Sequence, residues 1–164
     1  MSHSVSNIDK HIRTMTQFDL EPVMAIEKET YEFPWTMGIM SDCLKVNGYH
    51  CFVYEVENEV RGYIIFSTVL DEAHLLNVCI APEYQNRGLG LSFMTWMMNY
   101  LRESGSKTLY LEVRESNHAA IHLYQSMGFN ETGVRHNYYP AKKGKEDAHL
   151  FACELALIWN QNHE

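Results

Sequence analysis

The chain lacks several patterns that mark membrane, secreted and metal-binding proteins. No apolar run approaches the roughly 18 residues that a membrane-spanning helix requires, and residues 1–10 lack the apolar core of a signal peptide. The four cysteines are scattered, and no two of them have the CxxC spacing of a zinc site or a redox motif. We therefore expect a cytoplasmic protein with four reduced thiols and no membrane association.

Positive charge is also scarce. The 13 Lys and Arg residues stand against 21 Asp and Glu residues, which gives a formal net charge of −8. Nucleic-acid backbones select surfaces rich in Lys and Arg, so we expect no nucleic-acid partner. The same balance suits a basic substrate, although the need for solubility explains it equally well.

One pair of histidines has a spacing that can chelate zinc. His118 and His122 are at i and i+4, but the residues between them include no Glu, unlike those of an HExxH motif. We interpret both as exposed helix residues and expect no metal.

The length and the 46% apolar content fit one globular domain. We expect a polar leader over residues 1–10, a domain over 11–158 and a polar tail over 159–164. Apolar periodicity and capping residues predict helices over 19–31, 36–45, 88–103 and 117–127. Strands are predicted over 51–56, 60–70, 74–81, 108–114, 129–136 and 149–158, with a hairpin turn at 57–59. The mixture is α+β, with antiparallel neighbours early and helical crossovers later.

The most informative motif is Gln85-Asn86-Arg87-Gly88-Leu89-Gly90, which lies between a predicted strand and a predicted helix. A helix N-terminus exposes free N–H groups and the positive end of the helix dipole, so it can hold a phosphate. Gly88 and Gly90 have no Cβ, which allows a ligand to approach the backbone closely.

Two common phosphate-binding motifs do not fit this turn. A P-loop needs Gly-Lys-Ser/Thr, but Leu91 and Ser92 follow Gly90. A dinucleotide-binding turn needs a third small residue where Phe93 stands. The remaining pattern, Gln-x-x-Gly-x-Gly after a strand ending in Ala-Pro, resembles the acetyl-CoA pyrophosphate loop of the GNAT superfamily of N-acetyltransferases.

The resemblance extends over about residues 16–155. The second half of the GNAT fold is matched by Leu111-Glu112-Val113-Arg114, Ser116-Asn117, Ala119-Ala120-Ile121, Leu123-Tyr124 and Met127-Gly128-Phe129. Three further segments resemble the RimI-type ribosomal-protein-alanine N-acetyltransferases, namely Phe33-Pro34-Trp35, Asn137-Tyr138-Tyr139-Pro140 and Glu146-Asp147-Ala148. The resemblance implies a twisted mixed sheet of six to seven strands, split near residues 78–80, with helices on both faces.

It also implies residues that hold acetyl-CoA. By resemblance, pantetheine pairs with the backbone of Val78, Cys79 and Ile80, and the N–H of Val78 faces the thioester carbonyl. The pyrophosphate would lie against Asn86, Arg87, Gly88, Leu89, Gly90 and Leu91, with Gln85 completing the motif. Asn117 would bind the cofactor arm, although a residue at this place can equally cap the helix.

Two residues match the catalytic groups of the family. Glu112 corresponds to the general base, acting through water, and Tyr124 to the acid that protonates the coenzyme A thiolate. Asn117, Ile121 and Tyr124 fall at i, i+4 and i+7 on one helix stripe. Without the resemblance, Tyr124 would be read as a core residue and Glu112 as a solvated one. Phe33, Trp35 and Tyr138, with Tyr139 beside it, are candidates to line the peptide groove.

The resemblance implies acetyl transfer to the α-amine of an N-terminal alanine of a small-subunit ribosomal protein, by direct attack in a ternary complex. The partner would be the N-terminal peptide of that protein, and the enzyme is expected to be a monomer. Two alternatives stay open, which are acetylation of lysine or small-molecule amines and a non-catalytic acyl-CoA-binding sensor.

Overall fold

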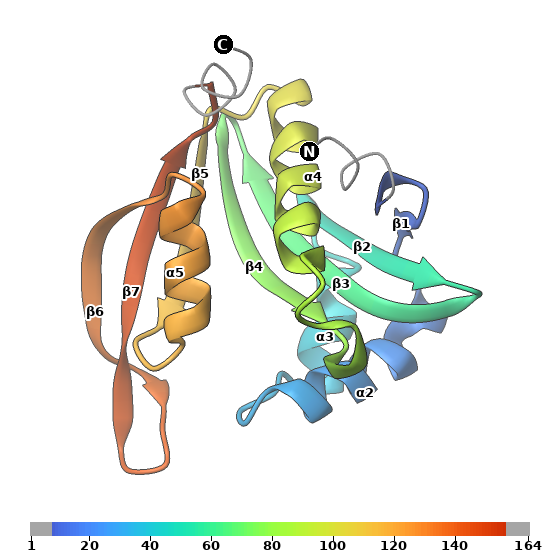
Figure 1. The fold of residues 1–164 in the computed structure, drawn as a ribbon, viewed down its shortest axis with the longest axis horizontal. Coiled ribbons are helices and arrows are strands. Elements are labelled where there is room, and N and C mark those ends of the chain that lie inside the picture. The colour runs from blue at the N-terminus through green and yellow to red at the C-terminus, as the bar shows by residue number, and fades with distance from the viewer. Residues whose placement is uncertain (1–7, 157–164) are drawn as a thin grey trace. The chain divides into compact units, whose positions relative to one another are not determined.

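The computed structural model describes residues 8–156 (Figure 1). The predicted tail over 159–164 and the first seven residues of the predicted leader lie outside the described residues. Two compact units divide the chain. Among the described residues, the first unit holds 8–68 together with Leu76–Tyr100, and the second holds Val69–Leu75 together with 101–156. The single domain over 11–158 stays a prediction.

The strands form one seven-stranded sheet. Its hydrogen-bonded order is β1 (Ile12–Thr14), β2 (Tyr49–Val56), β3 (Glu59–Val69), β4 (Glu72–Ile80), β5 (Thr108–Arg114), β7 (Lys145–Glu154) and β6 (Asn130–Pro140). The pairs β1–β2, β2–β3, β5–β7 and β6–β7 are antiparallel, whereas β4 and β5 are parallel. The predicted α+β class and the mixed sheet of six to seven strands are therefore confirmed.

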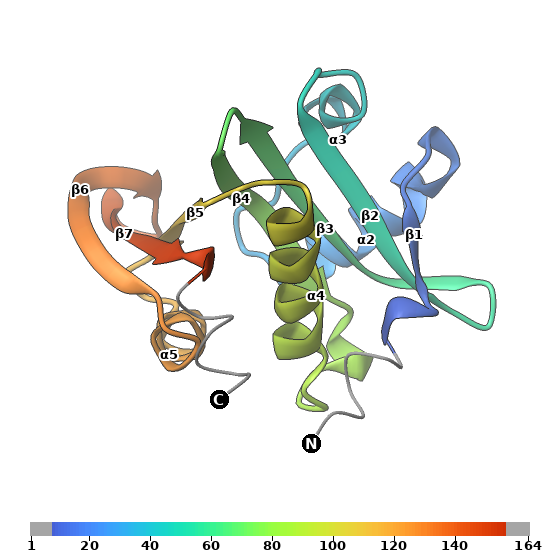
Figure 2. The ribbon, with the colours of Figure 1, turned by 90° about the horizontal axis from the view of Figure 1, so that it is seen from above.

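The described part of the first unit contains the N-terminal strands, the α-helices α2, α3 and α4, and two short 3-10 helices. Its strands and α-helices are β1 (Ile12–Thr14), α2 (Leu20–Thr30), α3 (Met37–Cys43), β2 (Tyr49–Val56), β3 (Glu59–Val69), the second part of β4 (Glu72–Ile80) and most of α4 (Leu89–Glu103). Helix α4 covers one face of the β2–β3 pair, and α2 and α3 cover the other (Figure 2). The predicted helices on both faces are present. The short strand β1 was not predicted, because three residues carry too little periodicity.

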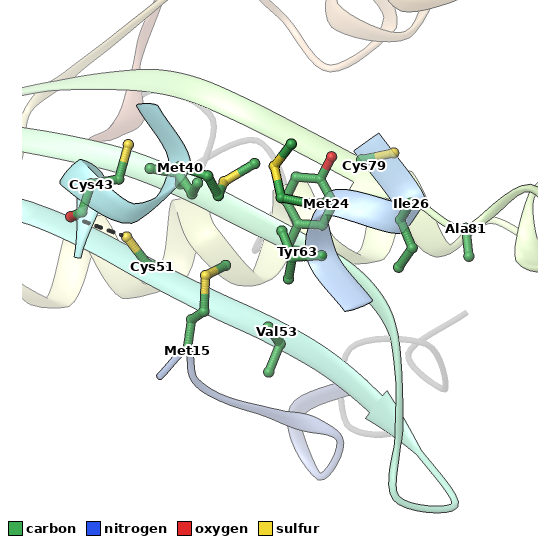
Figure 3. Close-up of a cluster of buried hydrophobic side chains, with 12 residues drawn as sticks. Met15, Met24, Ile26, Met40, Cys43, Cys51, Val53, Tyr63, Cys79 and Ala81 are labelled. Atoms are coloured by element: carbon green, nitrogen blue, oxygen red, sulfur yellow. Dashed lines mark hydrogen bonds between the residues drawn. The ribbon is translucent and has the colours of Figure 1, made fainter. Parts of the chain in front are cut away.

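The face under α2 and α3 carries a buried core, shown in Figure 3. Apolar side chains recur along α2 at Val23, Met24 and Ile26, and they pack against Val53 and Tyr63 of the sheet. The chain's four cysteines are buried free thiols, with burial as the leading cause of a raised pKa at each. No disulfide joins any of the four in the structure.

The opposite face of the same strands is aromatic. Phe52 meets Trp96 of α4 edge-on, with ring centroids 4.8 Å apart, and Phe66 meets Tyr100 at 5.6 Å. Trp96 also donates a hydrogen bond from Nε1 to Asp9, at 2.9 Å. These contacts explain why α4 is apolar around much of its circumference.

The second unit begins with the first residues of β4 and continues through the C-terminal strands. It contains β5 (Thr108–Arg114), α5 (His118–Ser126), β6 (Asn130–Pro140) and β7 (Lys145–Glu154), with α5 on one face of the strands (Figures 1 and 2). The predicted strand over 149–158 is wrong at its ends. It begins earlier, at Lys145, and residues 155 and 156 are helical, whereas 157 and 158 lie outside the described residues.

Strand β6 also runs further than its predicted end at residue 136. The register with β7 shifts between Arg135 and Tyr139, where Asn137 has a φ of 53°. Such a bulge interrupts the alternation of apolar and polar positions that marks a strand in sequence, which is why the prediction stopped there. No helix among residues 8–156 is both long and apolar enough to cross a membrane.

Candidate active site

The end of β4 presents one edge of its backbone. Strand pairing with β5 covers Glu72–His74 of β4, so Val78 and Ile80 lie beyond those pairs. The N–H of Ala81 bonds to the carbonyl of Arg61 in β3 at 2.8 Å. Because backbone groups alternate along a strand, those of Val78 and Ile80 point to the edge away from β3.

Side-chain donors form hydrogen bonds with the carbonyl oxygens of both residues on this edge. The Tyr31 hydroxyl donates to the oxygen of Val78 at 2.6 Å, and Gln85 donates from Nε2 to the oxygen of Ile80 at 2.9 Å. Gln85, predicted to bind the cofactor, thus ties the phosphate turn to the strand before it. The N–H group of a strand residue lies on the same edge as its C=O, so the N–H of Val78 faces the side where the thioester was predicted.

The predicted phosphate turn has the backbone of an anion cradle. Asn86 and Gly88 have φ values of 62° and 76°, and the N–H of Ser92 bonds back to the carbonyl of Gly88 at 3.1 Å as the helix begins. A Cβ built on Gly88 or Gly90 would meet no other atom within 4 Å, so the space beside both is open. The residues present therefore fit a bound pyrophosphate.

Arg87 adds a fixed positive charge to the turn. Its guanidinium donates from Nη2 to the carbonyl of Glu83 at 3.0 Å and stands 4.9 Å from the ring centre of Tyr84. These contacts orient an exposed side chain that would otherwise sample many rotamers. The arrangement agrees with a role in binding phosphate.

In the second unit, the predicted base Glu112 lies on β5 with a cation beside it. Its Oε1 is 3.7 Å from Nη2 of Arg135, and that guanidinium is 5.4 Å from the ring centre of Tyr138. Arg135 therefore links the predicted base to a predicted peptide-binding residue, and no motif in the sequence indicated this.

The predicted acid Tyr124 is buried on α5 and packs against Phe129, with ring centroids 5.7 Å apart. Burial raises the pKa of Tyr124 to about 12. The phenol is therefore protonated at neutral pH, which is the form that an acid must have. Core packing and an acid role are compatible at this position.

Asn117 caps helix α5. Its Oδ1 accepts a hydrogen bond from the N–H of Ala120 at 3.2 Å, as the alternative interpretation of the sequence expected. This bond uses the carbonyl oxygen of the side chain and not its amino group. A contact between Asn117 and the cofactor stays a prediction.

The RimI-type segments of the second unit join β5 to the β6–β7 hairpin. Arg114 donates from Nη1 to Glu146 at 2.8 Å and to the carbonyl of Pro140 at 2.6 Å, and its guanidinium lies over the Tyr139 ring. Arg114 holds the pKa of the Glu146 carboxyl below its usual value. These segments thus fix the shape of the hairpin that carries Tyr138.

The remaining residues singled out in the sequence lie in the loop after α2 and on α5. Phe33 and Trp35 lie in the loop between α2 and α3 of the first unit, and the N–H of Trp35 donates to Glu27 at 3.2 Å. His118 and His122 are exposed on α5. Within residues 8–156, no group of three or more His, Cys, Asp or Glu is placed to hold a metal ion.

A strand end with an oriented N–H edge, followed by a glycine turn at a helix N-terminus, agrees with the predicted class of acyl-CoA-dependent transferases. The model of the acetyltransferase (GNAT) family matches residues 20–129 of the chain. The chain belongs to the GNAT acetyltransferase family and is an acetyl-CoA-dependent N-acetyltransferase.

The chain is also similar to curated bacterial enzymes over most of its length. The chain is 37% identical over 146 residues, covering 89% of this chain and 98% of the relative, to the [ribosomal protein bS18]-alanine N-acetyltransferase of Escherichia coli K12. It is 40% identical to the enzyme of that name from Haemophilus influenzae, covering 84% of this chain and 93% of the relative.

Solved structures agree. The crystal structure of the ribosomal-protein-S18-alanine N-acetyltransferase from E. coli matches with a TM-score of 0.83 and 38% identity, covering 88% of this chain and 92% of that one. Ard1 from Thermoplasma volcanium matches with a TM-score of 0.78 and 26% identity, covering 87% and 95%. The predicted GNAT fold and the RimI-type resemblance are confirmed.

Proposed function

We propose that this protein transfers an acetyl group from acetyl-CoA to the α-amine of an N-terminal alanine of a small-subunit ribosomal protein. The observation that carries the proposal is identity of 37–40% to bS18-alanine N-acetyltransferases over more than nine tenths of their length. The acceptor is made in the cytoplasm, so we also propose that location. Residues 11–158 would act as one catalytic domain, since the family match runs through segments of both units.

Acetyl-CoA supplies an activated thioester. The residues of this chain bind it and provide the proton that the leaving thiolate needs. The turn at 86–91 holds the pyrophosphate through backbone N–H groups, and the N–H of Val78 stabilises the negative charge that develops on the carbonyl oxygen. Direct attack by the amine in a ternary complex needs no covalent enzyme intermediate.

The acceptor must lose a proton and the leaving thiolate must gain one. An N-terminal amine has an unperturbed pKa of about 8, so a carboxylate acting through water is a sufficient base. Glu112 takes this role, with the Arg135 guanidinium 3.7 Å from its Oε1. Tyr124, protonated because burial raises its pKa, donates the proton to the thiolate.

The experiment compares three peptides that differ only in the first residue, Ala, Ser or Met, with mass-spectrometric mapping of the acetylated atom. We expect acetylation of the α-amine, with kcat/KM for the Ala-first peptide roughly 10-fold or more above that for the Met-first peptide. An Ala-first peptide with a blocked α-amine and a free lysine is the control, and it should stay unmodified.

Two results would contradict the proposal. Acetylation of the lysine in the blocked peptide would favour the alternative acceptor class, because a lysine amine with a pKa of about 10.4 needs a stronger base. Tight binding of acetyl-CoA in calorimetry without turnover on any amine would favour the acyl-CoA sensor.

A further inference from the structure

A buried carboxylate lies in the first unit, outside the residues that the mechanism uses. Glu27, on the inner face of α2, has only 2% of its surface exposed. A buried carboxyl group is costly unless hydrogen bonds or a counter-charge compensate for the lost water. The hydrogen bonds around Glu27 must therefore offset this cost.

Three donors from three different segments reach this carboxylate. Tyr63 of β3 donates its hydroxyl proton to Oε2, and the N–H of Trp35 donates to Oε1 at 3.2 Å. Asn77 of β4 donates from Nδ2 to both oxygens, at 3.2 and 3.1 Å. Burial raises the pKa of Tyr63, which keeps that hydroxyl a donor. The carboxyl group of glutamate offers two acceptor oxygens, whereas the amide group of glutamine offers one.

A second bond joins the same two segments. Tyr31, which ends α2, donates its hydroxyl proton to the carbonyl of Val78 at 2.6 Å. Glu27 lies in the last turn of α2, and Tyr31 is the extended residue that follows the helix. The C-terminal end of α2 and the residue after it are thus bonded to consecutive residues of β4, Asn77 and Val78.

The two ends held by Glu27 are the ones that the proposed reaction needs. Asn77 precedes Val78, the proposed donor to the thioester oxygen, and Trp35 belongs to the loop proposed to line the peptide groove. We propose that Glu27 is a positioning residue, which holds the Val78 end of β4 and the loop of residues 33–35 in one fixed arrangement. This inference rests on the proposed function.

Positioning and simple structural support make different predictions. A bond that supports only the fold should cost stability and activity together, whichever donor is removed. A positioning bond should cost activity most when the donor on a functional segment is removed, because small displacements of reacting groups slow transfer strongly. The chain offers matched donors for this comparison, since Asn77 lies on the functional strand and Tyr63 in the core of β3.

The experiment measures kcat, KM for an Ala-first peptide, KM for acetyl-CoA and the melting temperature of three variants. In Asn77→Ala we expect kcat to fall about tenfold or more with KM for acetyl-CoA changed less than about threefold. In Tyr63→Phe we expect a lower melting temperature. Its kcat should stay within about twofold of wild type at a temperature where variant and wild type are both folded. Glu27→Gln, whose amide group faces a donor, should show the kinetic loss of Asn77→Ala.

Equal losses of kcat in Asn77→Ala and Tyr63→Phe would overturn the inference, as would unchanged kcat in Asn77→Ala. Hydrogen exchange gives a readout that does not need turnover. In Glu27→Gln, the amides of segments 31–36 and 76–81 should both exchange faster than in wild type. Exchange at the wild-type rate in either segment would overturn the inference. If wild type acetylates no N-terminal peptide, the proposed function fails and this readout still judges the role of Glu27.

Discussion

At the scale of single residues, burial decides what Tyr124 can do. Its side chain is packed against Phe129, and the pKa is raised to about 12 by burial. A phenol in this state donates a proton and does not act as a base at neutral pH. The same burial makes the position sensitive to changes in size, so the test must keep the ring.

Tyr124→Phe keeps the ring and removes the proton. We expect kcat to fall by roughly 10²-fold or more with little change in the affinity for acetyl-CoA measured by calorimetry. Since the pKa of Tyr124 is raised, its ionisation should not limit the rate of the wild type below about pH 10. Full activity in the variant would remove Tyr124 from the mechanism.

The sequence predicted site residues only where they belong to motifs with a recognisable order. Gln85, Glu112 and Tyr124 were proposed because each stands at a fixed place beside glycines or on a patterned strand or helix. Glu27 and Asn77 carry no such signal, because fifty positions separate them and only the fold brings them together. Arg135 was missed for the same reason, since its partner Glu112 lies on another strand.

At the scale of elements, the close approach of β3 to the end of β4 sets the geometry of the cofactor strand. A Cβ at Gly62 would lie 2.9 Å from the carbonyl oxygen of Cys79 and 2.9 Å from Cδ1 of Ile80. Backbone oxygen cannot move as a flexible side chain can. Glycine at this position therefore lets β4 keep the path that presents Val78.

We expect Gly62→Ala to displace the end of β4, which should lower stability by about 1–3 kcal/mol and weaken acetyl-CoA binding. Denaturant unfolding and calorimetry measure the two effects. Gly133→Ala is the matched control, because its Cβ would meet only Cδ1 of Leu150 at an ordinary 3.8 Å. Equal acetyl-CoA affinity in the two variants would show that the β3–β4 contact does not shape the cofactor strand.

The elements predicted from sequence were those with local signals. Thr36 caps α3 through the N–H of Ile39, and Glu57 and Asn58 adopt the positive φ values of a tight hairpin turn, both as expected. The ends of β6 and β7 were misjudged, because the bulge near Asn137 is fixed by pairing between strands and not by local periodicity.

At the scale of the whole molecule, the net charge of −8 is the property most relevant to a partner. Long-range attraction speeds and strengthens the encounter with a basic acceptor, whereas a charge that serves solubility alone affects all acceptors equally. The two explanations of the acidic composition therefore differ in how the acceptor responds to salt.

Raising the salt concentration from about 0.05 M to about 0.5 M should increase KM for a basic Ala-first peptide by roughly threefold or more, because screening shortens the reach of the charge. A neutral peptide with the same first residue is the control and should change little. Steady-state kinetics on both peptides gives the comparison. Parallel changes in the two values of KM would assign the charge to solubility.

The bond from Gln85 to the carbonyl of Ile80 has a consequence for recognising related sequences. The side chain at the first position of the glycine turn acts within the protein, as an N–H donor that reaches the end of β4. Arginine could replace glutamine there, since it also donates, whereas glutamate of nearly the same shape could not. A search pattern for such turns should therefore admit any long donor at this position and reject every side chain that only accepts.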